Sequence, residues 1–139
     1  MAEAWRGEGV TLPVVRFRRP VPALDRGLRR DLRTLATFVS IYCSQRHETR
    51  DKSPMFLKTH DVTAIAGREV CLCSSCAKLL SHAFMKRTHC PMDPKPACKH
   101  CPNHCYSPTY RKAMRSVMRY SGRRLLLAGR LDYLLHLLF

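Results

Sequence analysis

The sequence predicts a mainly α-helical domain of about four helices, with a cysteine- and proline-rich segment that binds metal. Apolar residues recur at spacings of three and four along several stretches, which is typical of amphipathic helices. All eight cysteines except Cys43 lie between positions 71 and 105. No stretch forms a convincing strand pattern. Together these observations favour a small helical fold in which thiolate ligands order the irregular part of the chain.

The length of 139 residues suits one domain. Residues 1–24 contain many arginines and prolines and little apolar periodicity, so we interpret them as a basic, flexible N-terminal arm. Residues 25–139 then form the single cysteine-rich metal-binding domain. A core of about a hundred residues is marginal on its own, so a bound metal would add stability.

The first helix is predicted from Arg26 to Gln45, with Asp25 as its N-cap. Its apolar face consists of Leu28, Leu32, Leu35, Val39 and Tyr42. If the helix runs slightly further, Cys43 and His47 lie on one side of its C-terminal end, because they are four residues apart.

Residues 48–70 are predicted to form a loop, with a short apolar turn at 55–57. A second helix should begin at Ser74 or Ser75 and end at Lys86, immediately after Cys73. Its apolar face consists of Cys76, Leu79, Leu80, Ala83 and Phe84. A C-x-x-C unit at a helix start favours thiolates, because the helix dipole and free N–H groups stabilise negative sulfur.

The segment 89–106 contains four prolines, so it is predicted to be irregular and ordered by metal ligation. A third helix is predicted from Pro108 to Tyr120, with Ser107 as N-cap and Ser121-Gly122 as its stop signal. A last, leucine-rich helix is predicted over about 123–138, despite a glycine at position 129.

Two C-x-x-C units predict the metal site. Two thiolates three residues apart can reach one tetrahedral ion, so Cys73, Cys76, Cys98 and Cys101 are expected to complete four ligands. The next candidate ligands, which can form a second site, are Cys90, Cys105, Cys43 and His47. Cys71 is interpreted as a spare thiol.

An alternative interpretation is one iron–sulfur cluster. Cys98, Cys101 and Cys105 form a C-x-x-C-x-x-x-C pattern, which overlaps the spacing of cubane ligation. Cys73, Cys76 or Cys90 would then supply the fourth thiolate. The sequence does not choose between zinc and iron, since thiolates bind both.

The formal net charge of +15 predicts attraction to polyanions such as nucleic acid. The basic side of the helix predicted at 108–120 is the candidate surface. Residues 1–10 contain two glutamates and no apolar core of a signal peptide, and no run of about eighteen apolar residues predicts a transmembrane segment. We therefore expect a cytoplasmic protein with reduced thiols.

Catalytic patterns are weak. The chain has no glycine-rich phosphate loop, carboxylate pair or Ser/His/Asp arrangement, so we expect a non-catalytic protein. One alternative function is a nucleic-acid-binding regulatory module with a structural zinc site. Another is a thiol redox enzyme that uses one C-x-x-C unit.

Several strings resemble the bacterial nitrous oxide-stimulated promoter family. They are Ile41-Tyr42-Cys43 with His47, the set Leu72, Cys73, Cys76, Leu79 and Leu80, Cys90-Pro91, Lys95-Pro96, the string CKHCPNHCYSP over 98–108, and VMRYSG over 117–122 with Arg124. The resemblance covers roughly residues 32–124. The resemblance implies a metal-binding protein of the nitrosative stress response. Its metal site is the expected target of nitric oxide, because nitric oxide attacks iron–sulfur and iron–thiolate centres, and nitrosation of zinc thiolates ejects the metal.

Overall fold

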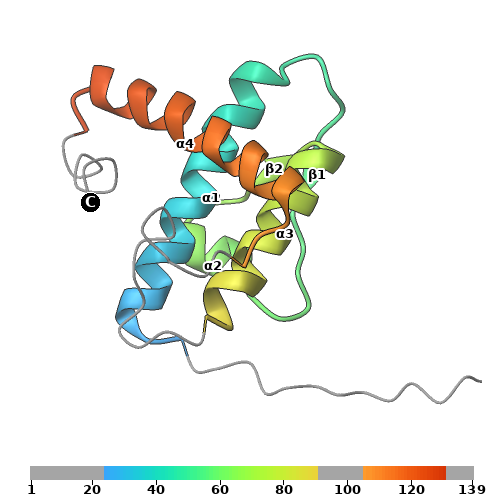
Figure 1. Ribbon diagram of the computed structural model, residues 1–139, viewed down its shortest axis with the longest axis vertical. Helices are drawn as coiled ribbons and strands as arrows, with labels where there is room; N and C mark the ends of the chain where they lie inside the picture. Colours follow the sequence, from blue (N-terminus) through green and yellow to red (C-terminus); the bar gives the residue numbers. More distant parts are fainter. Residues whose placement is uncertain (1–23, 91–104, 131–139) are drawn as a thin grey trace, which may run out of the picture.

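The computed structural model describes residues 24–90 and 105–130, which form a helical domain around one long helix, α1 (Arg26–Arg46). Three further helices contact it: α2 (Val62–Ala66), α3 (Ser74–Thr88) and α4 (Pro108–Leu127). Figure 1 shows α4 crossing over α1. The predicted mainly α-helical fold class is confirmed. The predicted N-terminal arm lies outside the described residues, except for residue 24.

Helix α1 begins as the sequence predicts, because the Asp25 carboxylate accepts a 2.7 Å hydrogen bond from the Leu28 N–H at its first turn. The helix ends at Arg46, and His47 is its C-cap residue. Of the predicted apolar face, Leu28, Leu32, Leu35 and Val39 are buried and Tyr42 is half-buried; Ala36, Phe38 and Cys43 of the same helix also belong to the core. The C-terminal end of α1 therefore lies against the core and holds Cys43 there.

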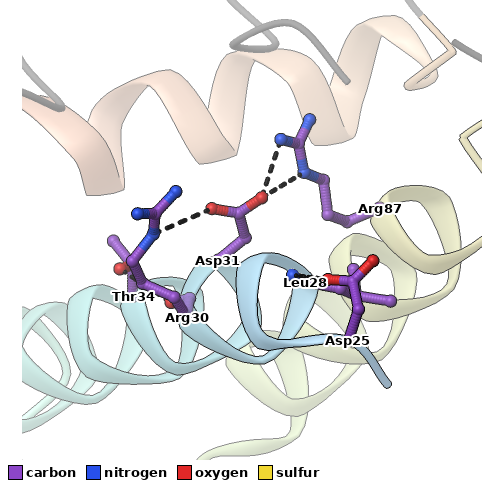
Figure 2. A network of polar contacts seen from close by, with 6 residues as sticks. All are labelled: Asp25, Leu28, Arg30, Asp31, Thr34 and Arg87. Carbon is purple, nitrogen blue, oxygen red and sulfur yellow. Dashed lines mark hydrogen bonds and ion pairs between the residues drawn. The ribbon is translucent and has the colours of Figure 1, made fainter. Parts of the chain in front are cut away.

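The end of α3 is joined to α1 by an ion pair. Nη2 and Nε of Arg87 lie 2.8 and 3.0 Å from Oδ2 of Asp31, as Figure 2 shows. The two side chains are 12% and 20% exposed, so water screens this pair only in part. The apolar face predicted for α3 is buried along its whole length.

Helix α4 corrects one prediction. Ser107 and Pro108 start it as expected, but Ser121-Gly122 does not stop it, and no separate helix begins at Arg123. The Ser121 hydroxyl is fully buried and donates a 2.6 Å hydrogen bond to the Phe38 carbonyl of α1. Because this hydroxyl binds α1, it does not compete with the backbone bonds of its own helix.

The stop signal lies seven residues later, at Gly129. This glycine has φ +78°, its N–H bonds the Leu126 carbonyl, and the N–H of Arg130 bonds the Leu125 carbonyl. This pair of bonds is a Schellman motif, which requires a left-handed residue and so favours glycine. The predicted continuation over 131–138 lies outside the described residues.

The segment 48–70 also differs from the predicted loop. It contains α2, which starts where Asp61 accepts a 3.0 Å bond from the Ala64 N–H and ends at Gly67, with φ +73°. A two-residue strand β1 (Ser53–Pro54) pairs antiparallel with β2 (Cys71–Leu72). The expectation of no strand was therefore wrong, because pairs this short show no readable alternation.

The short sheet positions α3, since β2 ends directly before Cys73. Leu72 of β2 is buried, whereas Cys71 is exposed. In the part of the chain that the structure describes, no helix combines the length and apolar character that a membrane crossing requires.

Candidate metal centre

Four side chains with metal-ligand chemistry meet between the end of α1 and the start of α3. They are Cys43, His47, Cys73 and Cys76, and their ligand atoms all lie within 4.8 Å of one another. Among the residues that the structure describes, these four are the cysteines, histidines or carboxylates that lie close enough together to hold one ion. The structure therefore contains a candidate metal centre of three thiols and one imidazole.

Each helix supplies one pair of ligands at a short sequence spacing. Cys43 lies in the last turn of α1, and the N–H of His47 bonds its carbonyl oxygen at 3.1 Å, so the two side chains share one side of the helix end. Cys73 is the N-cap residue of α3, and Cys76 lies in its first turn. The dipole of α3 places its positive end at these two sulfurs.

The distances fit a single tetrahedral ion. His47 Nδ1 lies 3.2 Å from Cys76 Sγ and 3.5 Å from Cys73 Sγ. Four ligands of this type around zinc are separated by about 3.6–3.8 Å when each keeps its usual bond length. Small outward shifts of the side chains would therefore accommodate an ion. Three cysteines and one histidine are also an established donor set for structural zinc.

The three sulfurs are shielded from solvent, whereas the imidazole is not. Cys43, Cys73 and Cys76 are 0%, 2% and 3% exposed, and His47 is half-buried. A buried thiolate is costly unless it is neutralised by hydrogen bonds or a cation. The site therefore combines a water-poor sulfur cluster with one ligand at the surface.

The pKa values of the three thiols differ because their surroundings differ. Burial alone would raise the pKa of Cys73, but hydrogen bonds from the Ser75 hydroxyl, the Cys76 backbone N–H and the neighbouring thiols lower it to about 5. Burial raises the pKa of Cys43 and that of Cys76, where the neighbouring Cys73 adds to the effect. Without metal, the cluster therefore favours one thiolate at Cys73 and two protonated thiols.

The chain after His47 is fixed to the start of α3. Lys52 Nζ donates a 2.8 Å hydrogen bond to the His47 carbonyl, and Arg50 Nη1 donates one of 2.9 Å to the Ser75 hydroxyl. That hydroxyl lies 3.4 Å from Cys73 Sγ. The Arg50–Ser75 bond links the segment after α1 to the start of α3, and the Lys52 bond holds that segment against the end of α1.

The structure groups the candidate ligands differently from the sequence prediction. It brings Cys73 and Cys76 together with Cys43 and His47, two pairs that the sequence analysis assigned to separate sites. Cys98 and Cys101 lie outside the described residues, so their ligation stays a prediction. The remaining described cysteines lie outside the four-residue group as free thiols: Cys71 and Cys105 are exposed, and Cys90 is half-buried.

A family model described as "Nitrous oxide-stimulated promoter" matches residues 26–139. The chain belongs to this family. The matched region contains all four residues of the metal centre.

The chain is also similar to a relative from Escherichia coli (strain K12), "Uncharacterized protein YgbA". The two are 56% identical over 32 residues, which span 23% of this chain and 27% of YgbA. The similarity thus covers about a quarter of that relative's length. No solved structure matches the chain.

Proposed function

We propose that this protein binds one metal ion through Cys43, His47, Cys73 and Cys76 and acts, without catalysis, in the cytoplasmic response to nitrosative stress. The observation that supports metal binding is the convergence of four ligand atoms within 4.8 Å from two helices. The link to nitrogen oxides rests on the description of the family. A bound ion would also stabilise the contact between α1 and α3.

The compactness of the ligand group favours a single ion over an iron–sulfur cluster. In a four-iron cluster each thiolate binds a different iron, and in a two-iron cluster the four ligands are divided between two irons, so ligands of separate irons lie further apart than ligands of one ion. The distances of 3.2 and 3.5 Å from the imidazole to two sulfurs match ligands that share one centre. The proposal is therefore a mononuclear site that holds zinc or thiolate-bound iron.

The donor set fits both zinc and iron, and the bound protein would behave differently with each metal. Three thiolates and an imidazole are typical of structural zinc, and soft thiolate ligands also bind iron. When bound, the metal supplies a centre that nitric oxide can attack directly or through its thiolate ligands. The chain's own contribution is to bury the sulfurs and to leave the His47 side of the site open to small molecules.

The test is anaerobic purification of the full chain, followed by metal analysis and an absorption spectrum. We expect one ion per chain; visible charge-transfer bands would identify iron, and a colourless zinc-loaded protein would identify zinc. Cys43→Ser and Cys73→Ser should each reduce metal content and lower the melting temperature. Cys71→Ser is the matched control, since this thiol is exposed and lies outside the group.

A second comparison tests the ligand assignment. If Cys98 and Cys101 bind the same ion or another, Cys98→Ser will also lose metal, and the stoichiometry will separate one site from two. Full metal content in Cys43→Ser and Cys73→Ser would contradict the proposed ligands. Treatment of the loaded protein with nitric oxide should release metal or change its spectrum, and an unaltered site would contradict the proposed role.

A further inference from the structure

The solvent-facing side of α4 is a continuous basic surface. Five exposed residues form it, and we call them the α4 basic face: Arg111, Lys112, Arg115, Arg119 and Arg123. The four arginines follow one another at intervals of four residues. At 100° and 1.5 Å per residue, they cover an arc of about 120° and a length of about 18 Å.

No acidic group balances this charge along the helix. The sequence of α4 contains neither aspartate nor glutamate. Among the residues that the structure describes, the salt bridges involve Arg30 and Arg87 with Asp31, and none involves the α4 basic face. The opposite side of α4 is apolar and packs on the core through Met114, Val117 and Leu125. Within residues 24–90 and 105–130, the basic face therefore has no ion-pair partner, and its side chains lie outside the buried core.

We propose that the α4 basic face binds the phosphate backbone of double-stranded DNA, a function that goes beyond the metal site. Arginine predominates in it, and its planar guanidinium can donate two parallel hydrogen bonds to a phosphate. The major groove of B-DNA is about 12 Å wide and admits an α-helix, with phosphates along both edges. An arc of arginines spread over about a third of a helix circumference can contact both edges.

The composition of the face argues against other polyanions. A helix that lies in a membrane interface needs a row of exposed apolar side chains, but Met114, Val117 and Leu125 of α4 face the core, and Leu127 is a single exposed leucine at the end of the helix. Single-stranded nucleic acid is bound by free aromatic rings. Tyr110 instead stacks on His82, and the Tyr120 hydroxyl donates to Gln45. Double-stranded RNA has a major groove too narrow for a helix.

Helix α4 is also held firmly enough to present these charges in one arrangement. Ser121 bonds the backbone of α1 at 2.6 Å, and Tyr120 bonds Gln45 at 2.7 Å. A surface that is already ordered loses less entropy on binding. Because the contacts are to phosphates, we expect affinity with little dependence on base sequence.

The test measures binding of the full, metal-loaded chain to a short fluorescent DNA duplex of mixed sequence at several salt concentrations. One variant replaces the four arginines of the face with glutamine (R111Q, R115Q, R119Q and R123Q). The matched control removes the same charge from exposed sites elsewhere (R26Q, R29Q, K58Q and R68Q). Circular dichroism and metal content establish that both variants fold.

We expect the α4 variant to lower the slope of log affinity against log salt by roughly 3 to 4, since each phosphate contact contributes about 0.9. Its affinity at low salt should fall at least tenfold below that of the control. Equal losses in the two variants would overturn the proposal, because only net charge would then matter. It would also be overturned if wild type does not bind the duplex at low salt, or if anionic vesicles or polyglutamate bind the α4 face more tightly than DNA does.

Discussion

The imidazole of His47 stands edge-on to the phenol ring of Tyr42, with ring centroids 5.3 Å apart and planes at 84°. Tyr42 also packs edge-on against Tyr120 of α4, at 5.8 Å and 87°. One aromatic ring therefore lies between a candidate metal ligand and the neighbouring helix. This packing adds to the contacts of His47 Nδ1 with the sulfurs of Cys76 and Cys73 in fixing the orientation of the ring.

Replacing Tyr42 with leucine should weaken metal binding, because the His47 ring loses the face that orients it. Contacts that orient metal-binding histidines typically affect affinity by about 10–100-fold, and we expect a loss near the lower end. Competition with a chromophoric chelator measures it. Tyr42→Phe keeps the ring and should bind as wild type does; equal losses in the two variants would argue that the packing does not position His47.

Metal binding should release protons from the thiols and become tighter as pH rises. At pH 7 the lowered pKa of Cys73, about 5, leaves it a thiolate, whereas Cys43 and Cys76, whose pKa values are raised, must lose protons to bind. These two thiols should release about two protons per ion, so affinity should rise roughly a hundredfold per pH unit. Below pH 5 Cys73 adds a third proton and the dependence becomes steeper.

Calorimetric titration in buffers with different ionisation enthalpies measures the number of protons. Cys71→Ser should leave that number unchanged, because this thiol is outside the ligand group. An affinity that does not vary between pH 6 and pH 8 would contradict the ligation of Cys43 and Cys76.

The protein should lose stability below about pH 6.5 through His60. Burial, together with repulsion from His89, lowers the pKa of His60 below its usual value of 6.5, and its ring nitrogens lie 2.9 and 3.0 Å from the hydroxyls of Thr59 and Thr88. The unfolded chain therefore binds this proton first as pH falls. The stabilisation is complete above pH 6.5 and decreases below it, by up to about 1.4 kcal/mol per pH unit.

Urea unfolding between pH 5.5 and 7.5 measures this effect. The difference between wild type and His60→Gln isolates it from the metal ligands, since both proteins retain those. The variant should be less stable at neutral pH and show a flatter profile below pH 6.5. Parallel profiles would mean that His60 does not contribute to acid sensitivity.

The Asp31–Arg87 ion pair should contribute to the attachment of α3. Its side chains are largely shielded from water, so removing one partner with Asp31→Asn should lower the free energy of unfolding by roughly 1–3 kcal/mol. Arg30 also approaches Asp31, at 4.0 Å, but is 74% exposed. Arg30→Met is therefore the control and should change stability by less than about 0.5 kcal/mol. A double-mutant cycle with Arg87→Met measures the coupling, and a coupling near zero would contradict the prediction.

The starts of the long helices could be predicted from sequence because their signals are local. Asp25 and Ser107 accept hydrogen bonds from the first turns of their helices, as expected. The end of α4 was predicted wrongly: Gly122 does not have the positive φ of a helix stop, and the helix continues through the buried Ser121. The hydrogen bond from the Ser121 hydroxyl to the Phe38 carbonyl joins residues 83 positions apart, so the local sequence pattern does not predict it.

The candidate site shows the same division between local and distant information. The spacing within Cys43–His47 and within Cys73–Cys76 places each pair on one side of a helix end, and this followed from sequence. Which pairs meet depends on the packing of α1 against α3, which pattern and spacing do not encode. Residue type and spacing supplied the candidate ligands but not their grouping.

The ligand order along the chain has a consequence for biosynthesis. The last of the four residues, Cys76, precedes α4 and the rest of the chain. When Cys76 is added to the growing polypeptide, residues 77–139 of this sequence remain to be translated, so all four candidate ligands are synthesised before α4. We therefore expect the four candidate ligands to be available for an ion before α4 packs against α1.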